Sequence, residues 1–265
     1  MLTNVKIDIR YSQQKKKVKV MDVYIYLAII GIIAGLVKGI SGFGSSLVII
    51  PLVRLFTDIP MEDLVVMLIT LNVSLNLLLF LESKAYKANR LKSVWVLTLF
   101  GAIFSIVGLE LLHSLEDNVI QYLSMCLIVL AIIVKTISLF EIRIAVKESC
   151  YLQAIIGTMS GLGNGIASID GPPVVFYLAG INADKTKFRS VLATHFLIMG
   201  LIAVIYSVID STYTREILLD TGFLIIFTIM GLILGILLSR KLDEKKFGLI
   251  VVVILIGLLI SMIVA

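Results

Sequence analysis

The sequence predicts an all-helical protein that crosses a membrane several times. The mean hydropathy of the 265 residues is +1.08, and 59% of them are hydrophobic while only 15% are charged. A soluble domain has about 45–50% apolar residues and needs a polar coat that this composition cannot supply. Long apolar stretches recur along the whole chain, and two of them are interrupted by glycine and proline. We therefore expect an all-α polytopic membrane protein with about eight hydrophobic elements in two duplicated four-element halves.

The N-terminal tail, residues 1–22, is polar and basic. The apolar run that begins at Val23 exceeds the ~7–15 residues of a signal-peptide core, and no small-x-small cleavage site follows it. We expect the tail to be retained and cytoplasmic, because basic residues collect on that side of a membrane.

The membrane elements follow from length, because a spanning helix needs about 20 apolar residues. Seven stretches meet this requirement: 23–40, 63–82, 93–113, 118–140, 188–209, 217–239 and 246–264. The region 150–181 is apolar at first and then rich in glycine and proline, and it predicts a broken element. The first element is also broken, with glycines before a second apolar piece at 47–56.

The two broken regions share one spacing, Gly-x3-Gly-x11-Pro, and the second copy lies 122 residues after the first. The matching pairs are Gly35 and Gly157, Gly39 and Gly161, Pro51 and Pro173, with Ser46 and Ser168 at the same offset. This indicates a first membrane repeat at 23–140, a connecting loop at 141–149 and a second repeat at 150–265. Irregular backbone at membrane depth persists only where protein or a water-filled cavity satisfies it, so the breaks predict a site.

The distribution of Lys and Arg predicts the topology. If the first broken element crosses once, the first half fits four crossings with its basic loops inside. A single crossing by 150–181 would then place two later basic clusters outside. We therefore expect 150–181 to enter and leave on the cytoplasmic side, which leaves the C-terminus outside.

Helix starts near the breaks would present unpaired N–H groups and partial positive charge to an anion. The candidate ligands for a small anion are Lys38, Gly42, Gly44, Ser45, Ser46, Asn72, Asn76, Asn164, Gly171 and Thr194. Glycines also permit close helix packing, and Asn, Ser and Thr also join helices by hydrogen bonds, so both alternatives stay open. Charges within a membrane are costly, which makes Lys38 and Asp170 either a site or a salt bridge. Asp170 and His195 are the candidate proton-coupling groups, although a lone histidine is often structural.

Other classes of function lack their signatures. The chain contains no P-loop, HExxH, GxSxG or dinucleotide fingerprint, and its two cysteines, Cys126 and Cys150, form no CxxC pair. We expect no enzyme activity, no metal, no cofactor and no nucleic-acid partner. The expected partners are a small anionic substrate and the lipid bilayer, and a homo-oligomer stays open.

The segments GLVKGISGFGSSLVIIPLV (35–53) and GLGNGIASIDGPPVVFYLAG (161–180), with Phe188 and Arg189, resemble the signature regions of the TauE/SafE family of sulfite and organosulfonate exporters. The resemblance implies a permease with duplicated halves that moves small anions across the cytoplasmic membrane. It also adds Arg189 to the candidate ligands. Lys38 and the pair Ser45-Ser46 depart from the family pattern.

Together these observations predict a secondary transporter for sulfite, a sulfonate or a related organosulfur oxyanion, working in the export direction by alternating access at two broken helices. The alternative is a membrane-embedded structural or assembly subunit without transport activity of its own. The short loops favour the transporter.

Overall fold

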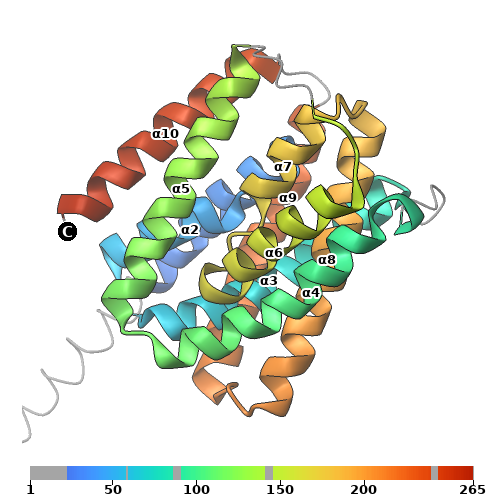
Figure 1. Cartoon of the computed structure of the whole chain (residues 1–265). Helices are drawn as coiled ribbons and strands as arrows, with labels where there is room; N and C mark the ends of the chain where they lie inside the picture. The colour runs from blue at the N-terminus through green and yellow to red at the C-terminus, as the bar shows by residue number, and fades with distance from the viewer. Residues whose placement is uncertain (1–22, 58, 86–90, 141–145, 240–243, 265) are drawn as a thin grey trace, which may run out of the picture.

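Figure 1 shows a computed structural model that describes residues 23–57, 59–85, 91–140, 146–239 and 244–264. Within these ranges the chain is helical and contains no β-strand. The helices are Val23–Ser41, α2 (Ser45–Phe56), α3 (Met61–Glu82), α4 (Leu91–Ser114), α5 (Asp117–Leu139), α6 (Cys150–Ala167), α7 (Gly171–Gly180), α8 (Lys185–Ile209), α9 (Arg215–Ser239) and α10 (Glu244–Val264).

Six of the described helices are long and apolar enough to cross a membrane. They are Val23–Ser41, Met61–Glu82, Val94–Ser114, Asp117–Ile137, Thr186–Ile209 and Arg215–Ser239. This confirms the prediction of an all-helical, multi-pass membrane protein.

The helix Val23–Ser41 and α2 fold back on each other, and we call residues 23–56 the first hairpin. The rings of Tyr26 and Phe56, near its two ends, stack with centroids 5.0 Å apart. The reversal occurs at Gly42 and Gly44, whose φ angles of 85° and 93° lie in the left-handed region that glycine tolerates best. The expectation that this region crosses the membrane once, giving four crossings in the first half, is therefore wrong. Both ends of the first hairpin lie on the same side.

Helices α6 and α7 form a second hairpin, residues 150–180. The amide of Val146, just before it, donates to the carbonyl of Gly180 at its end (2.9 Å). Inside the hairpin, Gln153 Nε2 donates to the hydroxyl of Tyr177 (3.3 Å). The two ends of 150–181 thus lie together, as the distribution of basic residues predicts.

Each hairpin begins with a helix that packs closely against a spanning helix. A Cβ on Gly35 would lie 2.7 Å from the backbone nitrogen of Leu232 in α9. A Cβ on Gly161 would lie 2.9 Å from the backbone nitrogen of Ser105 in α4. Real Cβ atoms do not approach backbone this closely, so only glycine permits these two helix contacts. Close helix packing is the role that the sequence analysis left open for the glycines.

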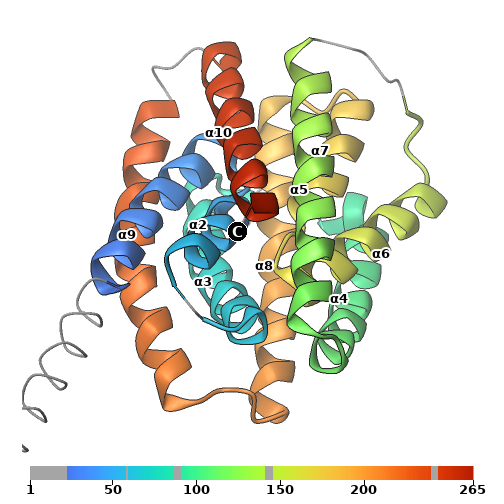
Figure 2. The ribbon, with the colours of Figure 1, turned by 90° about the vertical axis from the view of Figure 1, so that its left-hand side faces the viewer.

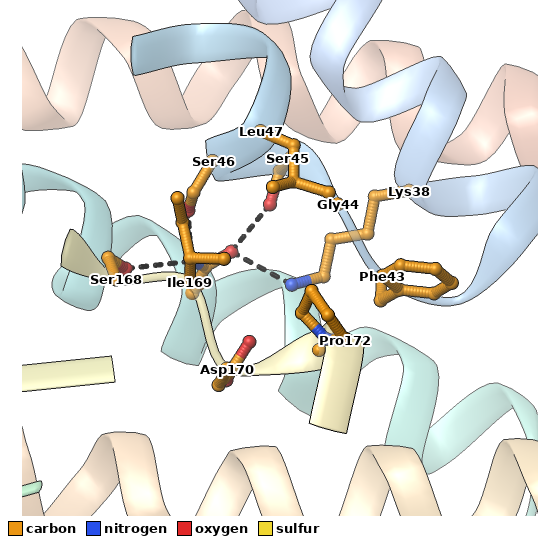
Figure 3. A pocket seen from close by; sticks show the side chains of 12 residues that line it. Lys38, Phe43, Gly44, Ser45, Ser46, Leu47, Ser168, Ile169, Asp170 and Pro172 are labelled. Atoms are coloured by element: carbon orange, nitrogen blue, oxygen red, sulfur yellow. Dashed lines mark hydrogen bonds between the residues drawn. The ribbon is translucent and has the colours of Figure 1, made fainter. Parts of the chain in front are cut away.

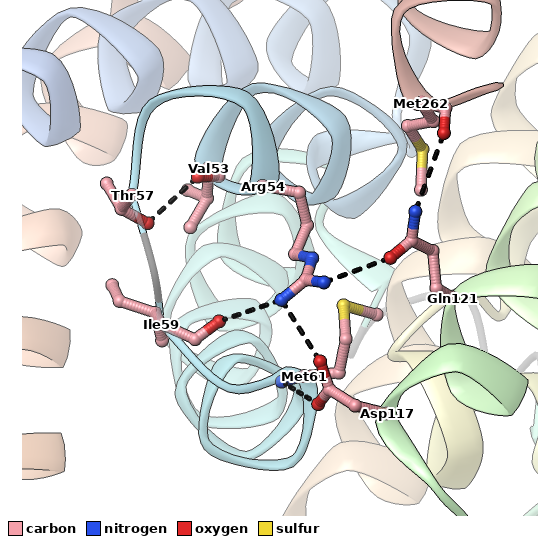
Figure 4. Close-up of polar contacts among 8 residues, drawn as sticks. All are labelled: Val53, Arg54, Thr57, Ile59, Met61, Asp117, Gln121 and Met262. Atoms are coloured by element: carbon pink, nitrogen blue, oxygen red, sulfur yellow. Dashed lines mark hydrogen bonds and ion pairs between the residues drawn. The ribbon is translucent and has the colours of Figure 1, made fainter. Parts of the chain in front are cut away.

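The open end of the first hairpin is anchored by the network in Figure 4. Arg54 pairs with Asp117 at the start of α5 (Nη1 to Oδ2, 3.0 Å) and donates to Gln121 (3.0 Å). Gln121 in turn donates to the carbonyl of Met262 at the end of α10 (3.5 Å). We call this side of the protein the first face.

The second hairpin opens on the opposite side, which we call the second face. Helix α5 leads away from the first face over the candidate span Asp117–Ile137, and the chain then enters α6. The two hairpins therefore enter the protein from opposite faces, and their tips meet in its interior.

Candidate functional site

The tips of the two hairpins enclose a small polar pocket (Figure 3). One residue of α3, Asn72, completes its wall. The lining residues are Lys38, Phe43, Gly44, Ser45, Ser46, Leu47, Asn72, Ser168, Ile169, Asp170, Gly171 and Pro172. Most of the polar candidates selected from the sequence therefore lie together.

Asn72 holds the two hairpin tips together through its side-chain amide. Its Oδ1 accepts hydrogen bonds from Lys38 Nζ (2.8 Å) and Ser45 Oγ (2.7 Å) of the first hairpin. Its Nδ2 donates to Ser46 of the first hairpin (2.9 Å) and to Ser168 of the second (3.1 Å). Since an amide has two donor sites and two acceptor sites, the hydrogen-bonding capacity of Asn72 is fully used.

Lys38 places a cation inside this pocket. Its side chain is only 3% exposed, and its ammonium group lies on the same side of the pocket as the carboxylate of Asp170 (Figure 3). Among the described residues Lys38 has no carboxylate within salt-bridge distance; its hydrogen bond goes to Asn72. The salt bridge to Asp170, the alternative considered from the sequence, is therefore not formed in this arrangement. A buried ammonium with one neutral partner can accept an anion as a further partner.

The helix starts at the two tips differ in what they offer a ligand. Gly44 precedes α2 without a side-chain cap, so the first N–H groups of α2, at Ser45 and Ser46, remain available at the pocket. Helix α7 begins Gly171-Pro172-Pro173, and proline has no N–H to donate. The first hairpin thus supplies the donors and the cation, whereas the second supplies the carboxylate of Asp170.

Several predicted residues lie outside the pocket and have structural partners. Asn164 donates to Ser105 of α4 (2.6 Å). Thr194 donates to the carbonyl of Ser190, one turn earlier in its own helix (2.7 Å). Gly42 has a positive φ of 85° in the turn of the first hairpin and does not line the pocket.

His195 belongs to α8 and is fully buried where this helix contacts α6 and α4. Its Nε2 lies 3.2 Å from Ser160 Oγ, and its Nδ1 lies 3.4 Å from Thr98 Oγ1. Ser160 also donates to the backbone carbonyl of Asp170 (2.9 Å). The histidine therefore connects to the second hairpin tip through one hydroxyl, and it does not line the pocket.

Asn76 lies one turn along α3 from Asn72, yet its environment is different. The residue is 1% exposed, and its Oδ1 has no hydrogen-bond partner. It does not line the pocket. Asn72 and Asn76 therefore lie on the same face of α3, but their surroundings differ.

Arg189, the residue added by the family resemblance, lies near the second face. It donates to Ser239 of α9 (3.2 Å) and pairs with Glu82 at the end of α3 (3.7 Å). It does not line the pocket. Arg189 thus joins three helices in this conformation.

The structure adds Phe43 to the site, a residue that sequence analysis did not select. Phe43 lies between the two glycines of positive φ at the first hairpin tip and is 8% exposed. A Cβ on Gly171 would lie 2.6 Å from its ring. An aromatic residue between turn glycines is a signal that the sequence contained, but an apolar side chain does not suggest an anion ligand.

Within the described ranges no group of three or more His, Cys, Asp or Glu side chains could hold a metal ion. Cys126 and Cys150 are free thiols on the surface.

The described residues form six helices long and apolar enough to cross a membrane, the first of which belongs to one of two inward hairpins, and the hairpin tips enclose a pocket with one ammonium and one carboxylate. This arrangement defines a polytopic membrane protein of the transporter class. The family model of the sulfite exporter TauE/SafE family matches residues 27–262, and the chain belongs to that family. No curated protein and no solved structure matches the chain.

Proposed function

We propose that this protein is a secondary transporter that exports a small anion, either sulfite, a sulfonate or a related organosulfur oxyanion. The observation that carries the proposal is the buried ammonium of Lys38 at the junction of the two hairpin tips. One helix terminus stabilises an anion by only about 0.3–2 kcal/mol, so a dehydrated anion also needs a cation. The α2 start and Lys38 supply both on the same hairpin.

The charges in the pocket suggest how transport is coupled. The empty pocket contains one ammonium, from Lys38, and one carboxylate, from Asp170. A bound anion adds a negative charge, and its binding becomes favourable when Asp170 takes up a proton. The proton and the anion would then cross together, so export would be driven by the outward concentration gradient of the anion. Asp170 is therefore the proposed proton-coupling group, whereas His195 reaches this tip only through the Ser160 hydroxyl, which donates to the backbone carbonyl of Asp170 and not to its carboxylate.

We infer that the two halves are inverted copies of each other. The first hairpin packs on α9 of the second half, and the second hairpin packs on α4 of the first half, which is the exchange expected from a two-fold axis. Inverted repeats in transporters place the substrate site at discontinuous helices near the membrane centre. The matching spacing of Gly35 and Gly39 with Gly157 and Gly161, which pack against α9 and α4 respectively, supports this relationship.

Alternating access requires contacts that can open at either face. At the second face Arg189 joins Glu82 of the other half (3.7 Å). At the first face His113 contacts Glu62 (2.7 Å) and Asp210 of the other half (3.2 Å). We propose that these two groups of contacts break in turn, so that the pocket opens to one face at a time.

We propose that the second face is cytoplasmic. The segments that join helices at this face, 83–92, 140–149, 181–189 and 240–246, contain thirteen of the 23 basic residues, whereas those at the first face, 57–60, 115–116 and 210–214, contain none. Because Val23 lies at the first face, this assignment places the start of the first helix outside. It replaces the expectation of a cytoplasmic N-terminus, which rested on the basic tail alone.

Thiol labelling of intact cells checks this orientation. In a Cys126→Ser, Cys150→Ser background, Glu116→Cys at the first face should react with a membrane-impermeant maleimide added outside. The native Cys150, tested in Cys126→Ser, should react only after the cells are permeabilised. The reverse pattern would show that the tail, and not the loops, sets the orientation.

The function itself is tested by flux. The purified protein in proteoliposomes should release trapped, labelled sulfite or methanesulfonate faster than protein-free vesicles do. If no anion from a panel of sulfite, sulfonates and sulfate moves, the transporter proposal fails. The chain would then be better explained as a structural membrane subunit.

A further inference from the structure

A second, apolar chamber lies beside the polar pocket, between the first hairpin, α5 and α10. Figure 2 shows α5 and α10 next to each other in front of the hairpin. Ala131 and Lys135 of α5 form part of its wall. Ala131 is 2% exposed, so this part of the chamber is enclosed by protein.

One layer of residues separates the chamber from the polar pocket. Phe43, Gly44 and Leu47 line both spaces. The ring of Phe43 is wedged against the second hairpin, because a Cβ on Gly171 would lie 2.6 Å from it. A glycine with positive φ lies on each side of Phe43, and the Ser41 hydroxyl donates to the carbonyl of Phe43 (2.6 Å). The backbone of this short turn is therefore held in place, and the movement required of Phe43 is rotation of its ring.

The far end of the chamber is lined by the carbon chain of Lys135, because the wall of the chamber is apolar throughout. Lys135 lies near the end of α5 at the second face, and its Cε is 3.3 Å from the position of a Cβ on Gly248 in α10. The chamber therefore runs from Phe43 towards the face with the basic loops.

We propose that Phe43 is the gate between the anion pocket and this chamber, and that Lys135 attracts the anion at the other side of the gate. The inference rests on the proposed function, because it supplies the route between the pocket and the second face. An apolar constriction blocks a hydrated ion by excluding water, and rotation of the ring removes the block. A cation beyond the gate lowers the energy of an anion within the apolar chamber.

Accessibility of the pocket tests the gate without requiring transport. The background is Cys126→Ser, Cys150→Ser, Ser46→Cys, with one thiol in the polar pocket. The probe is 2-sulfonatoethyl methanethiosulfonate, an anionic thiol reagent, applied at the second face. Phe43→Ala should raise the labelling rate at least about tenfold, because the apolar barrier is removed.

Two further changes test the route. Ala131→Phe should return the rate of the Phe43→Ala protein towards that of the parent, because the added ring fills the chamber. Lys135→Gln should slow the anionic reagent but not the cationic 2-aminoethyl analogue. Phe196→Ala, an equally large loss from a buried position outside both cavities, should leave labelling unchanged. Phe43→Leu, a milder change, should give an intermediate rate.

The proposal is overturned if Phe43→Ala and Phe43→Leu both label at the parent rate, or if filling the chamber with Ala131→Phe has no effect on the Phe43→Ala protein. Labelling through an open chamber in a protein that moves no anion would instead contradict the proposed function alone.

Discussion

Replacing Asn72 by leucine should abolish anion flux and lower the thermal stability of the protein. The substitution removes an amide that binds three residues of the first hairpin, Lys38, Ser45 and Ser46, and one residue of the second, Ser168. Each buried polar group left without a partner costs about 1–3 kcal/mol, and a charged group costs more. The loss should therefore reach several kcal/mol, measured as a lower midpoint of thermal unfolding, with flux at the level of protein-free vesicles.

Asn76→Leu is the matched control, because it is the same substitution one turn away in the same helix. Asn76 Oδ1 has no hydrogen-bond partner, so leucine removes a buried unsatisfied carbonyl. The unfolding temperature should stay the same or rise, and flux should be kept. Equal damage from both variants would mean that α3 tolerates no change here, and the bridging role of Asn72 would have no support. Loss of flux from Asn76→Leu alone would place Asn76 on the anion path.

The helix breaks could be predicted from the sequence because their causes are local. The first break falls at Gly42 and Gly44, where glycine tolerates a positive φ, whereas Gly35 and Pro51 of the spacing pattern lie inside helices, so the pattern marks only the neighbourhood of the break. The direction of the chain after the first break could not be predicted. It depends on two left-handed glycines, Gly42 and Gly44, and on the stacking of Phe56 with Tyr26, which is a tertiary contact. Counting basic residues fails there because the loop 57–60 contains none.

The site was predictable to the extent that its residues are close in sequence. Ser45 and Ser46 follow the first break, and Asp170 lies in the second, so the breaks themselves select them. Residues chosen from helical faces fared differently, because a shared face does not reveal which helix packs against it. Asn72 faces the hairpin tips, whereas Thr194 bonds to its own helix. Arg189 has a partner, Glu82, at the end of another helix, which a single sequence does not reveal.

Lys38→Met should abolish saturable anion transport while keeping most of the side-chain volume. Without the ammonium, the anion would face the carboxylate of Asp170 with no cation in the pocket. Methanesulfonate should then no longer raise the unfolding temperature, because stabilisation by a ligand requires binding to the native state. Transport that survives this change would show that the anion is held without Lys38.

Asp170→Asn separates the binding of the anion from its coupling to protons. If anion binding requires a neutral Asp170, the affinity of the unchanged protein for methanesulfonate rises as the pH falls, while the ligand stays ionised. Asparagine is permanently neutral, so the Asp170→Asn protein should bind methanesulfonate tightly at every pH at which Lys38 keeps its proton, and it should lose the dependence of flux on a proton gradient. The double variant Lys38→Met, Asp170→Asn has no charged side chain in the pocket. It should fold well, yet it should bind no anion. If the double variant regains transport, charge balance alone governs the pocket. If the Asp170→Asn protein keeps the pH dependence, the coupling proton binds to another residue. His195 is then the next candidate, because Ser160 links it to the same hairpin tip.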